Sequence, residues 1–272
     1  MIQAVLFERY DQLLIVAALA LCACSNDDES EEDYGEGSPQ ASNIIQRKGY
    51  QYLYNSKGLI TTINRIDTQK DEHGNVLGYD YVTVASFSYP KSNRAVMVND
   101  NGDSFVFAFG ADNFAHRIIE TDADGESYLI KLTYDKDGHI TKLDDASCDI
   151  LELKYTNGNL SYIKGNNNDA DAYATISYGP RTDFYDLGMS PFLFDLSMGP
   201  FAGDLNWWFG ELEHALYAGF LGKPFAHNIP SQITSYDKYN GKQYSVISFY
   251  TVPDGNGHYT EYFHQETVSG EQ

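Results

Sequence analysis

The stretch that decides the fold runs Tyr128-Leu129-Ile130-Lys131-Leu132-Thr133-Tyr134-Asp135-Lys136-Asp137-Gly138-His139-Ile140-Thr141-Lys142-Leu143. It holds two short segments rich in aromatic and β-branched residues, which favour strands. Between them lies an Asp-rich turn that contains Gly138, and glycine provides the positive φ that a tight turn requires. The stretch therefore predicts a β-hairpin.

The same pattern recurs through the chain. Residues 49–63 and 151–163 repeat it closely, weaker copies centre on residues 89–93 and 109–113, and a late variant spans 250–262. The aromatic residues that end each first strand lie 20 to 35 residues apart, at Tyr54, Tyr89, Phe109, Tyr134 and Tyr155. Two strands with their turns fill such a period. We predict an all-β fold, a curled antiparallel sheet or open barrel of successive hairpins with roughly 12–14 strands.

The aliphatic residues after each turn are spaced by three, as in Ile60 and Ile63, or Ile140 and Leu143. Successive residues of a strand point to opposite faces, so two residues three apart do not share a face in a regular strand. Either a β-bulge follows each turn or both faces of the sheet are partly covered.

The N-terminus carries the features of a lipoprotein signal. Residues 13–21 are a short apolar run, followed by Cys22-Ala23-Cys24. Nine residues are too few to span a bilayer but match the apolar part of a signal peptide. We predict a signal peptide over residues 1–23 and lipidation of Cys24; the alternative is an ordinary secretory signal with an incidental cysteine.

An acidic segment follows Cys24. Six of the nine residues 25–33 are Asp or Glu, a composition that favours a disordered tether over residues 24–42. Its start, Cys-Ser-Asn-Asp-Asp-Glu, resembles the export signal of Bacteroidetes lipoproteins, although a plain polar spacer would have a similar composition. The resemblance implies an outer-membrane location, lipid-anchored and facing the cell exterior. A single β domain over residues 43–272 is expected to follow.

The charge and the cysteine count exclude several classes. The net charge of −21 argues against nucleic acid and anionic lipid headgroups as partners, which leaves the lipid anchor as the expected membrane contact. Of three cysteines, Cys22 leaves with the signal and Cys24 is lipidated, so Cys148 has no partner for an intrachain disulfide. We expect Cys148 to be a small residue buried in a strand.

The hairpin pattern breaks over residues 184–229. Asp204 can cap a helix near 204–221, with an apolar stripe through Trp208, Leu212 and Leu216 and with Gly222 past its end. One interpretation is a helix that plugs the curled sheet. The other is an apolar ligand site between helix and sheet, for which Trp207, Trp208 and Tyr217 are the candidate binding residues.

Motifs for catalysis or metal binding are absent from the sequence. It has no HExxH, nucleophile elbow or phosphate loop, and Glu211 with His214 is too small a set for a metal site. The segments 122–125 and 135–138 resemble fragments of a calcium loop but lack its closing Glu, so hairpin turns are expected there. We predict no catalytic residue, no metal ligand and no cofactor. A pair of carboxylates for glycoside hydrolysis can be neither found nor excluded in so acidic a chain.

The hairpins at 49–63, 128–143 and 151–163 resemble the YD repeats of Rhs-type surface proteins. With the lipobox, the acidic tether and the late segment 216–223 followed by Asn228-Ile229-Pro230-Ser231, the chain more closely resembles a Bacteroidetes lipoprotein family of unknown function with a porin-like β-fold. The resemblance covers about residues 45 to 265. The family has no established activity to transfer.

Three functions fit these observations. The first is a binding or structural module at the cell surface, whose aromatic sheet face contacts a glycan or a surface protein. The second is an enzyme acting on polysaccharide, and the third is a carrier of lipid or another hydrophobic ligand under the 204–221 helix. Burial of Tyr50, Tyr52 and Tyr54 would remove the main support for the glycan platform.

Overall fold

The computed structural model describes residues 37–40, 49–145, 150–165, 172–179, 212–224, 226, 230–237, 239–253 and 259–267. The chain divides into two units, Met1–Asp33 and Tyr34–Gln272, and every described residue belongs to the second. The predictions for the signal peptide, Cys24, most of the tether, Cys148, Trp207 and Trp208 lie outside the described residues.

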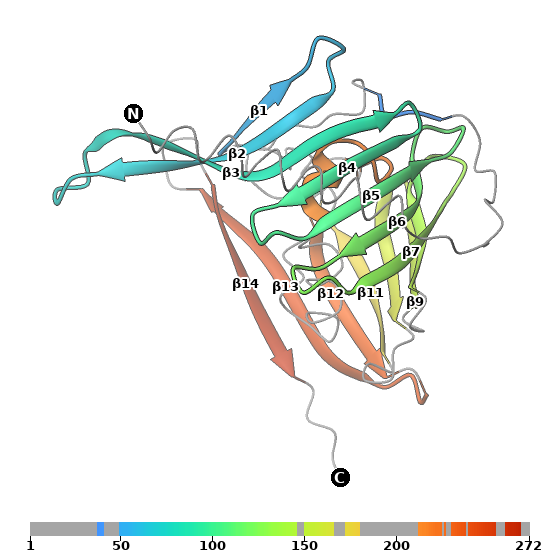
Figure 1. Ribbon diagram of the computed structural model, residues 1–272. Helices are drawn as coiled ribbons and strands as arrows, with labels where there is room; N and C mark the ends of the chain where they lie inside the picture. The colour runs from blue at the N-terminus through green and yellow to red at the C-terminus, as the bar shows by residue number, and fades with distance from the viewer. Residues whose placement is uncertain are drawn as a thin grey trace. The chain divides into compact units, whose positions relative to one another are not determined.

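Fourteen strands form one antiparallel sheet in which each strand pairs with its neighbours in sequence (Figure 1). They are β1 (Tyr50–Tyr54), β2 (Ile60–Lys70), β3 (Val76–Lys91), β4 (Arg94–Asn99), β5 (Ser104–Phe109), β6 (Ala115–Thr121), β7 (Ser127–Tyr134), β8 (Ile140–Asp145), β9 (Ile150–Thr156), β10 (Asn159–Gly165), β11 (Ala172–Tyr178), β12 (Pro230–Asp237), β13 (Gln243–Pro253) and β14 (Tyr259–Thr267). In the described part of the chain β1 does not pair with β14, so the sheet is not closed. The predicted fold class, an open sheet of successive hairpins, is confirmed.

A β-bulge explains why the aliphatic residues are spaced by three. Thr61, Thr141 and Ser161 have no partner in the pairing of their hairpins, because the register shifts at each of them. Each of these side chains donates a hydrogen bond of 3.1–3.2 Å to a carbonyl of the preceding strand. Because of this extra residue, two aliphatic residues three apart point to the same face of the sheet. Both members of each pair are buried: Ile60 and Ile63, Ile140 and Leu143, Leu160 and Ile163.

Five hairpin turns share one construction. Each begins with an Asn or Asp whose Oδ1 accepts hydrogen bonds from the main-chain N–H groups two and four residues later. The fourth residue is a glycine with φ between 76° and 95°. The five turns begin at Asn55, Asp71, Asn99, Asp122 and Asp135. The calcium-like segments at Asp122 and Asp135 are therefore hairpin turns, as predicted, and their carboxylates bind the main chain.

The described part of the insertion contains a short helix over residues 212–217, and no described helix is long and apolar enough to cross a membrane. The predicted end near Leu221 is too late, because a Schellman motif ends the helix first. The N–H of Gly219 donates to the Leu216 carbonyl and that of Phe220 to the Ala215 carbonyl, both over 3.0 Å. These hydrogen bonds make Gly219, which has a φ of 76°, the capping glycine that Gly222 was expected to be.

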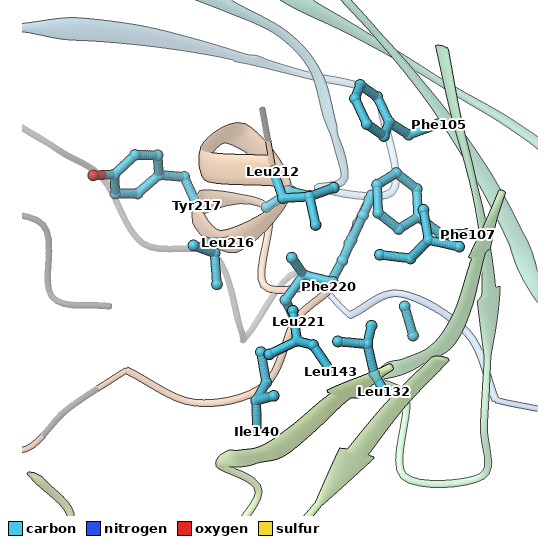
Figure 2. Packing of buried hydrophobic residues seen from close by; sticks show 14 of the residues in the cluster. Phe105, Phe107, Leu132, Ile140, Leu143, Leu212, Leu216, Tyr217, Phe220 and Leu221 are labelled. Carbon is cyan, nitrogen blue, oxygen red and sulfur yellow. The ribbon is translucent and has the colours of Figure 1, made fainter. Parts of the chain in front are cut away.

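The helix and the segment after it pack against the apolar face of the sheet, and their side chains join one buried cluster with those of the strands (Figure 2). The Phe220 ring lies 5.1–6.4 Å, centroid to centroid, from four rings of β3 and β5: Phe87, Tyr89, Phe107 and Phe109. Main-chain hydrogen bonds of 2.8 Å tie the same segment to three hairpins, at Ala115, Gly138 and Gly158. The segment after the helix is short, yet it contacts both β3 and the β9–β10 turn. The sheet must therefore curl around it. The described part of the insertion is thus a plug.

Candidate functional site

Tyr217 is the one predicted ligand-binding residue that the structure describes. Its ring is fully buried and lies 6.4 Å from the Tyr50 ring and 6.5 Å from the Tyr52 ring, centroid to centroid. Its hydroxyl donates a hydrogen bond of 2.9 Å to Oε1 of Glu213, one helical turn earlier. The ring therefore packs the helix against β1, and binding of a ligand by Tyr217 stays a prediction.

The expected aromatic platform on β1 is largely covered. Tyr52 is buried and Tyr50 is half-buried, both against Tyr217, while Tyr54 is 41% exposed. Two of the three rings thus belong to the core, which removes the support that these tyrosines gave to a glycan platform on this strand.

A second row of aromatic rings lies on β10, β11 and β12, on the face opposite the buried core. Tyr162 stacks on Tyr173 at 5.7 Å, and Tyr173 stacks on Tyr236 at 4.9 Å. The ammonium group of Lys154 covers the other end of the row, 4.6 Å from the centroid of Tyr162. The rings cover one another's faces, so this row stabilises strand pairing and offers little free ring surface. Burial, with the nearby charge of Glu152, raises the pKa of Tyr162.

Two His–Asp pairs flank the turns that face the plug. Nε2 of His116 lies 3.0 Å from the Asp112 carboxylate, and Nδ1 of His139 lies 3.3 Å from that of Asp135. Burial acts to raise the pKa of Asp135, but hydrogen bonds from the N–H groups of His139 and Asp137 outweigh it and hold the pKa below its usual value. A carboxylate used in this way holds a turn together. Among the described residues, no group of three or more His, Cys, Asp or Glu side chains could hold a metal ion.

Most of the exposed large hydrophobic residues of the described chain lie on a two-stranded arm formed by β2 and β3. Pairing of β1 with β2 ends at Arg65, and pairing of β4 with β3 begins at Ala85. Beyond these residues β2 and β3 pair with each other alone, and the ribbon extends away from the sheet (Figure 1). Five of the eight large hydrophobic residues that are exposed in the described chain lie on this arm: Val76, Leu77, Tyr79, Tyr81 and Val82.

The two faces of the arm differ in chemistry. Tyr81 lies opposite Ile66 and Tyr79 opposite Thr68, so these four side chains share one face. Tyr79 is 58% exposed and Tyr81 is 54% exposed. Neither has a ring contact or a side-chain hydrogen bond within the described part of the chain. Within the described part of the chain, this face of the arm is therefore uncovered.

The opposite face carries charged and polar side chains together with Val82, which lies opposite Arg65. Arg65 donates to the Asp67 carboxylate over 2.8 Å and thereby lowers the pKa of Asp67. Asp80 accepts a hydrogen bond of 2.6 Å from Nε2 of Gln69, and no described cation forms an ion pair with it. The turn at the tip adds Asp71 and Glu72. The arm therefore combines an uncovered aromatic face with an acidic one.

The spacing of the aromatic residues in the sequence carries a signal for this arm, which was not predicted. Tyr54 and Tyr89 lie 35 residues apart, whereas the later aromatic markers lie 20 to 25 residues apart. The surplus corresponds to the extra length of β2 and β3, which have 11 and 16 residues.

Two solved structures are similar to this chain, and the first of them supports the fold. A porin-like protein from Bacteroides uniformis ATCC 8492 is similar at 17% identity, with 82% of this chain and 91% of that chain covered and a TM-score of 0.50. A porin-like protein from Bacteroides vulgatus ATCC 8482 is similar at 10% identity, with 84% and 100% covered and a TM-score of 0.40. No match is found among curated proteins.

The family model of a domain of unknown function (DUF4595) with porin-like fold matches residues 47–260, which is most of the chain and nearly all of the sheet. The match agrees with the resemblance drawn from the hairpin repeats and the late segment. The chain therefore belongs to the DUF4595 family, whose members share a porin-like fold.

Proposed function

We propose that this protein is a lipid-anchored binding module at the outer surface of the cell, which contacts another surface molecule through the Tyr79–Tyr81 face of the β2–β3 arm. One observation carries the proposal: two exposed tyrosines share a face of a ribbon that the rest of the described sheet does not cover. Exposed apolar surface of this kind marks interaction sites, and tyrosine suits contacts to both glycans and proteins. The lipobox and acidic tether support the location.

The two alternatives have less support. The acid of a glycoside hydrolase has a raised pKa, and Asp67, Asp71 and Asp135 do not fit that role, because hydrogen bonds hold their pKa values below the usual value. A lipid carrier needs a cavity under the helix, whereas Leu216, Tyr217 and Phe220 are packed against the sheet with almost no exposed surface.

The test is an array that carries surface polysaccharides and tiled peptides of extracytoplasmic proteins, probed with the full chain. The double variant Tyr79→Ser/Tyr81→Ser is expected to lose the binding. Tyr239→Ser is the matched control, because Tyr239 is also highly exposed but lies on the turn between β12 and β13. Binding that the double variant retains, or an array without any binding, would overturn the proposal.

A further inference from the structure

The free edge of β3 is a place where another strand can pair. The N–H of Ile66 donates to the Gly49 carbonyl over 2.9 Å, so the main-chain groups of Ile66 point away from β3. In an antiparallel ladder, directly opposite residues point their main-chain groups either toward each other or away from each other. Tyr81, which lies opposite Ile66, therefore turns its N–H and C=O away from β2, and Tyr79 does the same two residues earlier.

Within the described part of the chain, this edge lacks three common protections of an edge strand. Natural edge strands are commonly guarded by lysine, by proline or by neighbouring structure. Residues 76–83 read Val-Leu-Gly-Tyr-Asp-Tyr-Val-Thr and contain neither lysine nor proline. β4, the neighbour in the sheet, first pairs with β3 at Ala85, beyond this segment. Within the described part of the chain, no strand therefore pairs with the outward-pointing main-chain groups of Tyr79 and Tyr81.

The side chains of the arm specify what that strand must carry. A residue added opposite Tyr79 or Tyr81 would lie on the aromatic face, and the residue between them would lie beside Asp80 on the acidic face. Asp80 has no described cationic partner, so a Lys or Arg there would be attracted to it.

We propose that the β3 edge between Gly78 and Val82 binds an extended segment of a partner protein whose side chains alternate between apolar and basic, and that this segment adds to the arm as a strand. This inference rests on the proposed function and names the class of its partner. A second copy of the chain fits less well, because each copy has a net charge of −21 and an acidic arm.

The test measures the affinity of the full chain for a labelled nine-residue peptide of alternating valine and lysine. Control peptides replace lysine by glutamate or group the same residues in two blocks. The alternating lysine peptide is expected to bind at least about tenfold more tightly than either control, with an affinity that falls as salt is added.

Two matched variants separate the edge from the rings. Tyr79→Ala removes the ring and keeps the edge N–H, whereas Tyr79→Pro removes both and leaves pairing with β2 intact, since that N–H points away from β2. We expect the proline variant to bind about tenfold more weakly than the alanine variant. Asp80→Asn, which keeps an acceptor for Gln69, is expected to weaken binding of the lysine peptide about threefold.

The outcomes are distinct. Equal affinity of the alanine and proline variants for the lysine peptide would overturn strand addition. Strand addition would also be overturned if the chain bound none of the peptides but bound a glycan through Tyr79 and Tyr81. In this second case the proposed function would stand. Association of two copies that Tyr79→Pro abolishes, without peptide binding, would overturn it in favour of a second copy. If neither peptide nor array binding depends on the arm, both proposals fail.

Discussion

The hydroxyl group of Tyr89 donates a hydrogen bond of 2.7 Å to the main-chain carbonyl of Ile60, on the neighbouring hairpin. Ile60 directly precedes the bulge at Thr61. The same relationship joins Tyr134 to Ala115 and Tyr178 to Leu160, each acceptor again preceding a bulge. The recurring tyrosine at the end of a strand therefore links each of these hairpins to another, and burial raises the pKa of all three phenols.

Replacing Tyr89 with Phe tests this link. The change keeps the ring packing but leaves the Ile60 carbonyl without its donor, so we expect the free energy of unfolding to fall by about 1 kcal/mol. Tyr79→Phe, at an exposed ring without such a bond, should leave the free energy of unfolding unchanged. Urea titration of the three proteins measures both. Equal stability of Tyr89→Phe and the unmodified chain would show that the hydrogen bond contributes nothing.

Replacing Gly222 with Ala tests how the plug docks on the sheet. Gly222 has a φ of 90°, and a Cβ there would lie 2.6 Å from the Gly138 carbonyl oxygen. Gly125→Ala is the matched control: its φ is 89°, but nothing lies within 4 Å of the added carbon. Both variants carry the backbone strain of about 1–2 kcal/mol. We expect Gly222→Ala to have the lower melting temperature of the two variants. Equal melting temperatures would mean that Gly222 is not packed closely against the β7–β8 turn.

The pH dependence of stability should depend partly on Asp135. Because its folded pKa lies below the unfolded value, the stability it contributes is present above the unfolded pKa of about 3.9 and is lost as the pH falls through the folded pKa. Asp135→Asn should therefore lose less stability than the unmodified chain between pH 6 and pH 3, as measured by urea titration at each pH. An identical loss of stability in both proteins would show that the Asp135 carboxylate does not contribute to the pH dependence.

Lipidation of Cys24 is tested by Cys24→Ser. Serine cannot form the thioether of a lipoprotein, so the variant should lack the mass of the diacyl group and should leave the membrane fraction or stay unprocessed. Mass spectrometry and fractionation measure these outcomes. Cys22→Ser is the matched control, and a lipid that remains on Cys24→Ser but disappears from Cys22→Ser would move the anchor to Cys22.

Much of the fold was predictable because each hairpin carries its own local signals. The Asx turns at Asn55 and Asp135, with glycine in the fourth position, mark where a strand reverses. The spacing of Ile60 and Ile63 left two explanations open, and the structure selects the bulge. The sequence could not choose between them, because the position of a bulge depends on pairing with the other strand.

The candidate site was harder to predict. Tyr50 and Tyr79 are both strand tyrosines in alternating segments, yet one packs on the helix and the other is exposed. What differs is whether a neighbouring element covers that face, which depends on contacts between distant parts of the chain. The helix end was misplaced for a local reason, since Gly219 and Gly222 both have positive φ and only the hydrogen bonds show that Gly219 is the cap.

The central claim, that the β2–β3 arm is the contact surface, is tested most directly by photo-crosslinking on intact cells. A photoreactive residue at Leu77, which is 69% exposed, is compared with one at Tyr239, which is 77% exposed. The account predicts a discrete crosslinked product from position 77 alone, and its loss in the Tyr79→Ser/Tyr81→Ser background. Equal products from both positions, or a product from position 77 that the double substitution leaves unchanged, would contradict it.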